Sequence, residues 1–231
     1  MSATKAWILI GTLTLSIPAL VPAEEKERKR LEACSQVIEE MAEMPEGIPR
    51  DLLDKAECVV VVPGVKKAAL GVGGRLGWGA AACRTARGGG PWSAPLMVSL
   101  KGGSLGLQIG GESSDFVLLV MNPKGIDHLL KSKFTLGADA SVAAGPVGRN
   151  AEAATDVLMH AEILSYSRSR GIFAGISLEG ASLAQDDKGN QAIYGAKVSA
   201  RELLLNPARR IPAAGRDLVE ALERLSSRRR G

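Results

Sequence analysis

The chain has 231 residues and a formal net charge of +4, from 29 basic and 25 acidic side chains. This mild positive excess and an aromatic content of 3% argue against nucleic-acid binding, which needs a strongly basic surface and aromatic rings that stack on bases. The length suffices for one sizeable domain with a hydrophobic core.

Residues 1–23 have the organisation of an export signal. Lys5 gives a positive start, residues 6–17 are apolar, and Val21-Pro22-Ala23 offers the small residues that a signal peptidase reads. The apolar run is shorter than the roughly 20 residues that cross a bilayer as a helix. We therefore expect cleavage after Ala23 and an exported protein, periplasmic or envelope-associated if the source is bacterial.

Residues 24–44 are predicted to form an amphipathic helix that Pro45 and Gly47 end. Its apolar stripe can pack on the domain core or lie in a membrane interface. The glutamates of the later turns would be repelled by anionic headgroups, which favours packing on the core. The residues of the stripe are Leu31, Cys34, Val37, Ile38, Met41 and Met44.

A short helix over 50–57 precedes Val59–Val62, four valines that predict a strand covered on both faces. Pro63-Gly64 is expected to turn the chain. The strands that follow alternate bulky residues with glycine or other small residues, most clearly over 70–82, and again over 105–110, 136–143 and 172–178.

Glycine inside a strand costs about 0.5 to 1 kcal/mol relative to alanine, so its repeated use calls for a geometric reason such as close backbone approach. We infer a curved or closed Gly-rich antiparallel β-sheet whose bulky faces form the main core and whose small faces bend inward. Sparse aromatic residues argue against a membrane-spanning barrel, which needs aromatic girdles.

The remaining elements are predicted from local signals. Asn122-Pro123 starts a central helix that continues to Lys133, 186–190 is expected to be a hairpin turn before a strand over 193–198, and 201–205 and 213–225 are helical. The predicted fold class is α+β. We divide the chain into a signal peptide (1–23), the amphipathic helix (24–44), a main domain (45–200) and a helical tail (201–231).

Three cysteines, Cys34, Cys58 and Cys83, permit at most one disulfide. An oxidising compartment would allow it, but the apolar surroundings of Cys58 and the strand end at Cys83 favour small buried thiols. The sequence leaves open whether any two of them are joined.

The stretch 145–180 combines a constrained turn, basic residues and strand alternation. GPVGR at 145–149, followed by YSRSRGIFAGISLEG at 166–180, resembles the signature of the SYLF (YSC84-related) domain family. IPRDLLDKAECVVVVPGVKKAALGVGGRLGWG at 48–79 and PWSAPLMVSLKGGSLGLQIGGESSDFVLLVMN at 91–122 resemble the same family, in the same order. The match covers roughly Pro45 to Gly195.

This resemblance implies a lipid-binding module without enzymatic activity. Eukaryotic members of the family are associated with phosphoinositide membranes and some with actin, while many bacterial members are exported. Because an exported protein would not meet actin, we expect no actin partner. The sequence shows no phosphate loop, dinucleotide fingerprint, hydrolase elbow or metal-ligand spacing, so we expect no catalytic residue, no metal and no cofactor.

The function predicted from these features is binding of anionic phospholipid headgroups. The alternative is a structural or protein-interaction module of the cell envelope that docks through the amino-terminal helix. Arg149 could bind an anion at its turn or pair locally with Asp139 or Glu152. We expect the candidate cations to gather on one exposed surface; they are Lys66, Lys67, Arg75, Arg149, Arg168 and Arg170.

Overall fold

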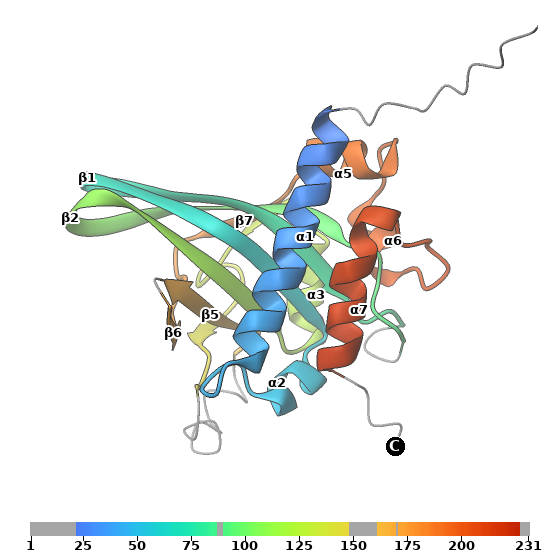
Figure 1. Ribbon diagram of the computed structural model, residues 1–231, viewed down its shortest axis with the longest axis horizontal. Helices are drawn as coiled ribbons and strands as arrows, with labels where there is room; N and C mark the ends of the chain where they lie inside the picture. Colours follow the sequence, from blue (N-terminus) through green and yellow to red (C-terminus); the bar gives the residue numbers. More distant parts are fainter. Residues whose placement is uncertain (1–21, 87–89, 148–160, 170, 227–231) are drawn as a thin grey trace, which may run out of the picture.

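The computed structural model describes residues 22–86, 90–147, 161–169 and 171–226, with only the backbone for 22, 68–72 and 104–112. It confirms the predicted α+β class: an N-terminal helix and C-terminal helices pack on a strongly curled sheet (Figure 1). The helices are α1 (Pro22–Glu43), α2 (Arg50–Lys55), α3 (Pro123–Leu129), α5 (Asp187–Tyr194), α6 (Ala200–Leu205), the 3₁₀ turn η2 (Ala213–Gly215) and α7 (Arg216–Leu225). The strands are β1 (Cys58–Cys83), β2 (Leu96–Val120), β3 (Lys133–Thr135), β4 (Val142–Ala144), β5 (Ile163–Ser169), β6 (Ile172–Gly175) and β7 (Ser182–Gln185).

Strand β1 folds back on itself. Its 26 residues would span roughly 80 Å if extended, at about 3.3 Å per residue. The Cα atoms of its end residues, Cys58 and Cys83, are nevertheless only 3.9 Å apart, and a disulfide joins their side chains. Strand β2 pairs antiparallel with β1 from Cys58↔Val120 to Ala81↔Leu96 and follows the same course. Residues 66–76 and 101–113 thus form a projection, the β arm (Figure 1).

Glycines let the two halves of β1 approach each other at the base of the β arm. A Cβ atom added at Gly79 would lie 1.9 Å from the carbonyl oxygen of Val61, and one at Gly77 would lie 2.6 Å from Cγ2 of Val65. Any side chain at either position would push the two halves apart. Close backbone approach, the reason predicted for the glycine-lined faces, is confirmed at these positions.

The bulky face of the returning half of β1 is not wholly part of the core. Leu76 and Trp78 are 37% and 42% exposed, contrary to the expectation that the bulky faces are buried. Their place explains the difference, because Leu76 belongs to the β arm and Trp78 lies two residues from it. Ala80, two residues further into the body, is buried.

The other strands attach to β2 rather than to β1. Strand β5 pairs with the end of β2, from Asp115↔Arg168 to Val120↔Ile163, and β7 pairs with its beginning, from Val98↔Gln185 to Lys101↔Ser182. Strands β3 and β6 extend β7 and β5 antiparallel, and β4 joins β5 parallel. The sheet is therefore curled and largely antiparallel, as predicted.

Curling gives the sheet an outer and an inner core. The four valines of 59–62 are all buried, which confirms a strand covered on both faces. Val59 and Val61 belong to the outer core, which lies under α1, α2 and α7, whereas Val60 and Val62 belong to the inner core with Phe116, Leu118 and side chains from α3 and α6.

Helix α1 lies across the outer face of the sheet (Figure 1), as the predicted amphipathic helix should if its stripe packs on the core. Leu31, Cys34 and Met41 are each 0% exposed. Near its start, Arg30 pairs with Glu27 at 2.8 Å and with Asp186 at 2.7 Å, which ties α1 to the beginning of α5. No helix in the described part of the chain is long and apolar enough to span a bilayer.

The segment after Asp186 is a helix, and the predicted hairpin turn and strand over 193–198 are wrong. The Asp186 carboxylate accepts a hydrogen bond from the Gly189 amide at 3.1 Å, which caps the start of α5. Gly195 ends α5 in the left-handed conformation, with φ of 70°. The same Asp and Gly residues that are typical of a hairpin turn therefore serve as the two caps of a short helix.

Candidate functional site

A cleft of about 150 Å³ opens where the β arm joins the body. It has an apolar floor and a polar rim. The side chains that line it come from both halves of β1, from β2, from β5 and from the segment after β6: Val65, Lys67, Arg75, Ser114, Phe116, Ser167, Ser169 and Ile176.

The cleft is the mouth of the inner core. Side chains at alternate positions of a strand face the same side of the sheet. Lys67 therefore shares the side of Val65, and Ser114 shares that of Phe116, two residues of the inner core. Arg75 shares the side of Gly77, which faces Val62 and Val65 across the base of the β arm. The curl of the sheet thus brings two cations to the end of an apolar interior.

Arg75 is the electrostatic centre of this cleft. Among the residues whose side chains the structure describes, none that lines the cleft is acidic, and no carboxylate lies within 4.0 Å of the Arg75 guanidinium. Burial lowers the pKa of Arg75 below its usual value, which means that the charged form loses solvation. Lys67 adds a second positive charge, and it pairs in register with Glu112 on β2. An anion that entered the cleft would stabilise the charged form of Arg75 and so compensate for the solvation lost on burial.

The chemistry of the cleft suits a small oxyanion. A guanidinium offers five N–H donors in a planar fork, an ammonium adds three more, and serine hydroxyls can also donate. Phosphate is the group for which such donors are typical partners in proteins. The volume is below the roughly 300 Å³ at which pockets for drug-sized ligands begin, so the cleft admits one small polar group rather than an entire lipid.

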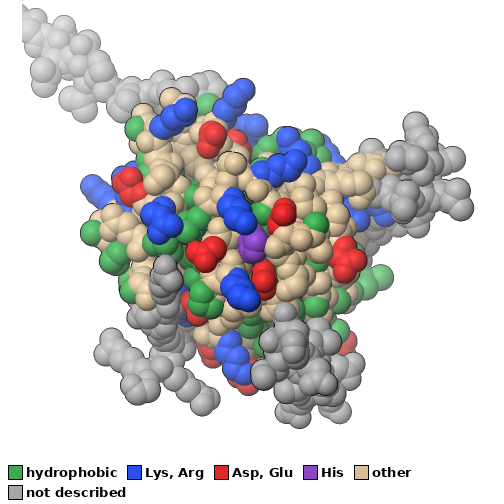
Figure 2. Space-filling model, turned by 180° about the vertical axis from the view of Figure 1, so that it is seen from behind, with side chains coloured by type: hydrophobic (Ala, Val, Ile, Leu, Met, Phe, Trp, Pro, Cys, Tyr) green, Lys and Arg blue, Asp and Glu red, His purple; other side chains and the backbone are tan. Residues whose placement is uncertain are grey.

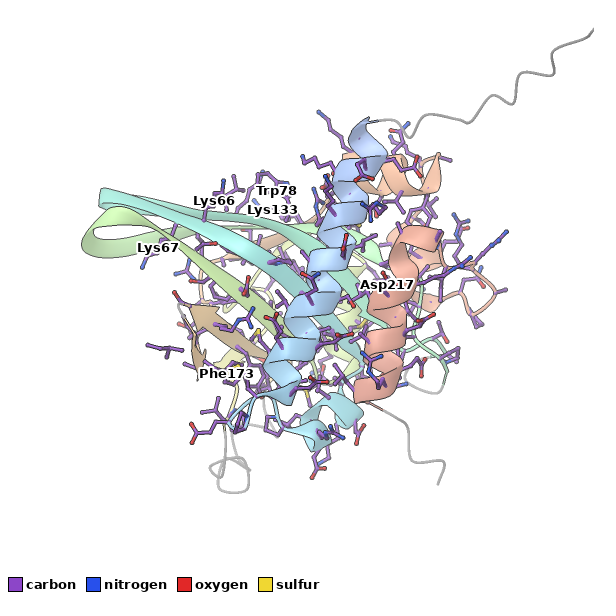
Figure 3. All side chains as sticks on the ribbon, viewed as in Figure 1. Lys66, Lys67, Trp78, Lys133, Phe173 and Asp217 are labelled. Atoms are coloured by element: carbon purple, nitrogen blue, oxygen red, sulfur yellow. A yellow bond between two sulfur atoms is a disulfide. The ribbon has the colours of Figure 1, made fainter. Side chains whose placement is uncertain are left out.

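The structure describes four of the six predicted cations, and it does not bring these four to one surface. Lys67 and Arg75 meet in the cleft, whereas Lys66 is exposed on the opposite side of the β arm, because neighbouring residues of a strand face opposite sides (Figure 3). Arg149 and Arg170 lie outside the described residues. On the face seen in Figure 2, basic and acidic side chains are interspersed, so this face has no continuous basic area.

Arg168 is neutralised by carboxylates from two other elements. Its Nη2 lies 2.8 Å from Oδ2 of Asp115 on β2, and its Nη1 pairs with Glu40 on α1. Asp115 also accepts a hydrogen bond from the Gly64 amide at 2.9 Å. Arg168 therefore links α1 to the sheet.

Three serines of the cleft were not found from the sequence. Ser167 and Ser169 alternate with Arg168 along β5, and the positions of the serines, not that of Arg168, face the cleft. Ser114 occupies the equivalent side of β2. The sequence offered strand alternation, which places Ser167 and Ser169 on one side of β5 and Tyr166 and Arg168 on the other. The structure then shows which side is which, because Tyr166 belongs to the outer core.

Two glycines of the 145–180 stretch, Gly145 and Gly175, have a packing role. A Cβ atom added at Gly145 would lie 2.1 Å from Cζ of Tyr166, and one at Gly175 would lie 1.9 Å from the carbonyl oxygen of Gly145. Tyr166 is fully buried and stacks on Phe173 with ring centroids 5.6 Å apart. The backbone at Gly145, the first residue of the GPVGR motif, thus packs directly against the ring of the buried Tyr166.

A second, more open cleft of about 440 Å³ lies beside α5 and α6. Two arginines, Arg209 and Arg210, and one acidic residue, Glu202, line it. Arg209 pairs with Glu202 at 2.8 Å and stacks over the ring of Tyr194 at 5.2 Å. Because an acidic side chain lines this cleft and neutralises one of its two guanidinium groups, the second cleft is a weaker candidate for binding an anion than the cleft at the β arm.

Comparison with known proteins gives consistent matches. The family described as Las17-binding protein actin regulator (Ysc84) matches residues 101–225. An SH3 domain-containing protein of Schizosaccharomyces pombe is 37% identical over 180 residues, and LAS seventeen-binding protein 3 of Saccharomyces cerevisiae is 31% identical over 200 residues. SH3 domain-containing YSC84-like protein 1 of Homo sapiens is 34% identical over 177 residues.

These alignments cover 77%, 85% and 76% of this chain but only 41%, 43% and 51% of the respective relatives. The chain thus spans about half the length of the curated relatives that it matches. The SH3 domains and the binding to Las17 that appear in these names are properties of the relatives.

The expectation that actin has no place among the partners is wrong. The matching family is described as an actin regulator, and its relatives are named as Las17-binding proteins. The expectation depended on the compartment inferred from residues 1–23, which says nothing about the surface of the folded domain.

The matched region includes the greater part of the curled sheet and the helices that follow it. It agrees with the SYLF-like motifs found along 48–180. This chain belongs to the Ysc84 (SYLF) family, whose members are binding modules rather than known enzymes.

Proposed function

We propose that this protein is a non-enzymatic lipid-binding module that holds the anionic headgroup of a phospholipid in the cleft at the base of the β arm. The half-buried guanidinium of Arg75 carries the proposal, because no carboxylate belongs to the described side chains that line the cleft. A structural arginine at such a position is usually paired, as Arg168 is.

An apolar floor beneath a cationic rim favours a lipid phosphate over a free inorganic anion. Val65, Phe116 and Ile176 give the cleft a surface that water solvates poorly, next to the charges that attract phosphate. The glycerol end of a phospholipid headgroup has the same combination of apolar and anionic parts.

Export remains part of this proposal. The disulfide between Cys58 and Cys83 supports it, because disulfides persist mainly in oxidising compartments. Residues 1–21 of the predicted signal peptide lie outside the described residues, and the predicted cleavage after Ala23 is tested by amino-terminal sequencing of the secreted chain.

Co-sedimentation with vesicles tests the proposal. The full chain is expected to bind phosphatidylglycerol-containing vesicles at low salt, more weakly at high salt, and pure phosphatidylcholine vesicles hardly at all. Each cleft cation near an anionic surface contributes about 1 kcal/mol, so Arg75→Gln is expected to weaken binding about fivefold and K67Q/R75Q about thirtyfold.

Arg168→Gln is the matched control, because it removes the same charge outside the cleft. It is expected to lower the stability of the fold while leaving vesicle affinity unchanged. Equal binding of the unaltered chain to anionic and neutral vesicles would contradict the proposal. An equal loss of affinity in Arg75→Gln and Arg168→Gln would show that net charge, and not the cleft, decides binding.

A protein-binding role is the second candidate, favoured by the names of the relatives. The apolar stripe of α1 is buried, so docking through this stripe would require α1 to leave the sheet. Co-sedimentation of the chain with filamentous actin, compared with the same measurement on K67Q/R75Q, tests whether a protein partner uses the cleft or another surface.

A further inference from the structure

The end of the β arm is apolar and without charge. No charged residue occurs in 68–74 or in 102–111, although both segments lie where the backbone extends farthest from the body (Figure 1). The register pairs these segments with each other, from Ala68↔Gly111 to Gly74↔Gly103. Projecting apolar segments are unusual in a soluble domain unless they meet a partner. The large apolar residues there are Leu70, Val72, Leu105, Leu107 and Ile109.

Positive charge follows directly behind this apolar end. Lys66, Lys67, Arg75 and Lys101 lie at the base of the β arm, where Lys66 and Lys101 are exposed. Glu112 is the one acidic residue that the sequence places within the arm segments 66–76 and 101–113. From the end of the arm toward the body, apolar residues therefore come first and cationic residues follow.

An aromatic residue lies at the same level as the body end of the arm. Trp78 is 42% exposed, with Nζ of Lys26 6.0 Å from the centre of its ring, and Leu76 is 37% exposed (Figure 3). Tryptophan with lysine beside it is typical of the boundary between headgroups and hydrocarbon in membrane proteins. The apolar end and the basic base thus follow the order of hydrocarbon and headgroups in a lipid leaflet, and Trp78 lies behind them on the side of the body.

We propose that the β arm inserts its apolar end into the interfacial region of an anionic phospholipid bilayer, while Lys66, Lys67, Arg75 and Lys101 contact the headgroups. This inference rests on the proposed function, to which it adds the mode of contact. From Leu70 to Arg75 the strand covers roughly 16 Å, so an arm that is strongly tilted from the bilayer normal places Leu70 about 5 to 10 Å below the headgroups that the cations contact.

The arm reaches the interface without crossing the membrane. Beyond the residues that pair with β5 and β7, the register joins β1 and β2 only to each other, which leaves open strand edges. Unpaired backbone groups are not tolerated in hydrocarbon, whereas insertion by about 5 to 10 Å at the headgroup boundary leaves them access to water.

A bilayer fits the arm better than a second copy of the chain does. Contact between two arms would bring two sets of like charges together at their bases, which repel each other, whereas an anionic lipid surface attracts every one of them. Charge complementarity therefore selects the lipid surface as the occupant.

A fluorescent label at the end of the arm tests this inference. The full chain with Leu70→Cys, labelled under non-reducing conditions with an environment-sensitive nitrobenzoxadiazole dye, is mixed with phosphatidylglycerol-containing vesicles. Emission is expected to shift to shorter wavelength, and a spin label near the headgroup is expected to quench it more than one near the chain ends. The same dye at Asp217→Cys, an exposed site on α7, is expected to show neither change (Figure 3).

A second variant gives the energetic contribution. L70Q/L107Q is expected to lower the vesicle partition coefficient by about tenfold, because two leucines lose their favourable transfer out of water. Binding of soluble glycerol 3-phosphate, measured by calorimetry, is expected to be the same as in the unaltered chain. The second result also shows that the variant is folded.

The failure of this inference is distinguishable from that of the proposed function. If the chain binds anionic vesicles but the dye at position 70 does not respond, the arm does not insert and the headgroup cleft stands alone. If vesicle binding is absent while glycerol 3-phosphate binds, bilayer contact by the arm is also overturned. Concentration-dependent dimerisation that L70Q/L107Q abolishes, seen by sedimentation velocity without vesicle insertion, would assign the arm to self-association instead.

Discussion

At the scale of single residues, burial strongly changes the acidity of the Cys34 thiol. It lies beneath α1 with no exposed surface, and its thiol donates a hydrogen bond to the carbonyl oxygen of Val61 at 3.5 Å. Burial raises the pKa of this thiol to about 12. Because the thiolate is the reactive form, Cys34 is expected to be inert in the folded chain.

Thiol counting with a disulfide-exchange reagent at pH 8 checks this expectation. The folded chain is expected to react with none of its cysteines, the chain unfolded without reductant with Cys34 alone, and the reduced and unfolded chain with all 3. Raising the pH toward 12 without unfolding is expected to increase the rate, as the thiolate fraction rises. Three reactive thiols before reduction would rule out the Cys58–Cys83 disulfide.

Arg75 and Arg168 show what a sequence can and cannot say about a single residue. Both were predicted as site cations on strands, yet one lines the cleft and the other is neutralised. The carboxylates of Asp115 and Glu40 that pair with Arg168 lie 53 and 128 residues away in the chain. Side-chain alternation predicts on which side of a strand a residue lies, but not which distant carboxylate shares that side.

At the scale of elements, the crossing of the two halves of β1 depends on glycine. At Gly79 the obstructing atom is the carbonyl oxygen of Val61, a backbone atom that cannot rotate away. At Gly103, on the exposed β arm, an added Cβ atom would meet nothing within 4 Å.

Alanine substitution at these two glycines separates packing from backbone entropy. Gly79→Ala is expected to destabilise the fold by about 3 kcal/mol, lowering Tm by roughly 6 to 12 °C for a chain of this size. Gly103→Ala is expected to leave stability unchanged or to raise it by about 0.4 to 1 kcal/mol. Thermal unfolding followed by circular dichroism measures both, and equal Tm values for the two variants would refute the crossing.

The elements themselves were largely predictable, but their connection was not. The valines of 59–62, the glycine alternation and the helix signals predicted β1, β2, α1 and α7 close to their observed bounds. The strand predicted over 136–143 is wrong, because this segment is mainly a turn with an isolated bridge between Leu136 and Ala140, and the helix predicted to continue to Lys133 ends at Leu129. The sequence did not predict that 58–83 is one strand that returns to its origin, because the disulfide and the contacts at Gly77 and Gly79 join residues far apart. Asp186 and Gly195 are equally suited to a turn and to helix caps, which explains the wrong assignment of α5.

For the whole molecule, the Cys58–Cys83 disulfide joins the two ends of β1 within the inner core, at the end of the strand away from the β arm. Cross-linking residues 25 positions apart restricts the unfolded chain. In the chain-entropy description this contributes about 3.5 kcal/mol to stability.

Removing the cross-link is therefore expected to affect the whole fold. C58A/C83A is expected to lose about 3.5 kcal/mol of unfolding free energy, measured by denaturant titration, beyond any cost of lost sulfur volume. Cys34→Ala removes one buried sulfur without a cross-link and is the control for that cost. A double variant no less stable than Cys34→Ala would show that the packed cores alone hold the two ends of β1 together.

Because β1 begins and ends at one disulfide, residues 58–83 form a covalent ring. Trypsin could cut this ring after Lys66, Lys67 or Arg75, all within it. A chain nicked there would still migrate as a single species until reductant was added. Cleavage of the projecting β arm would thus leave its fragments covalently joined through the disulfide.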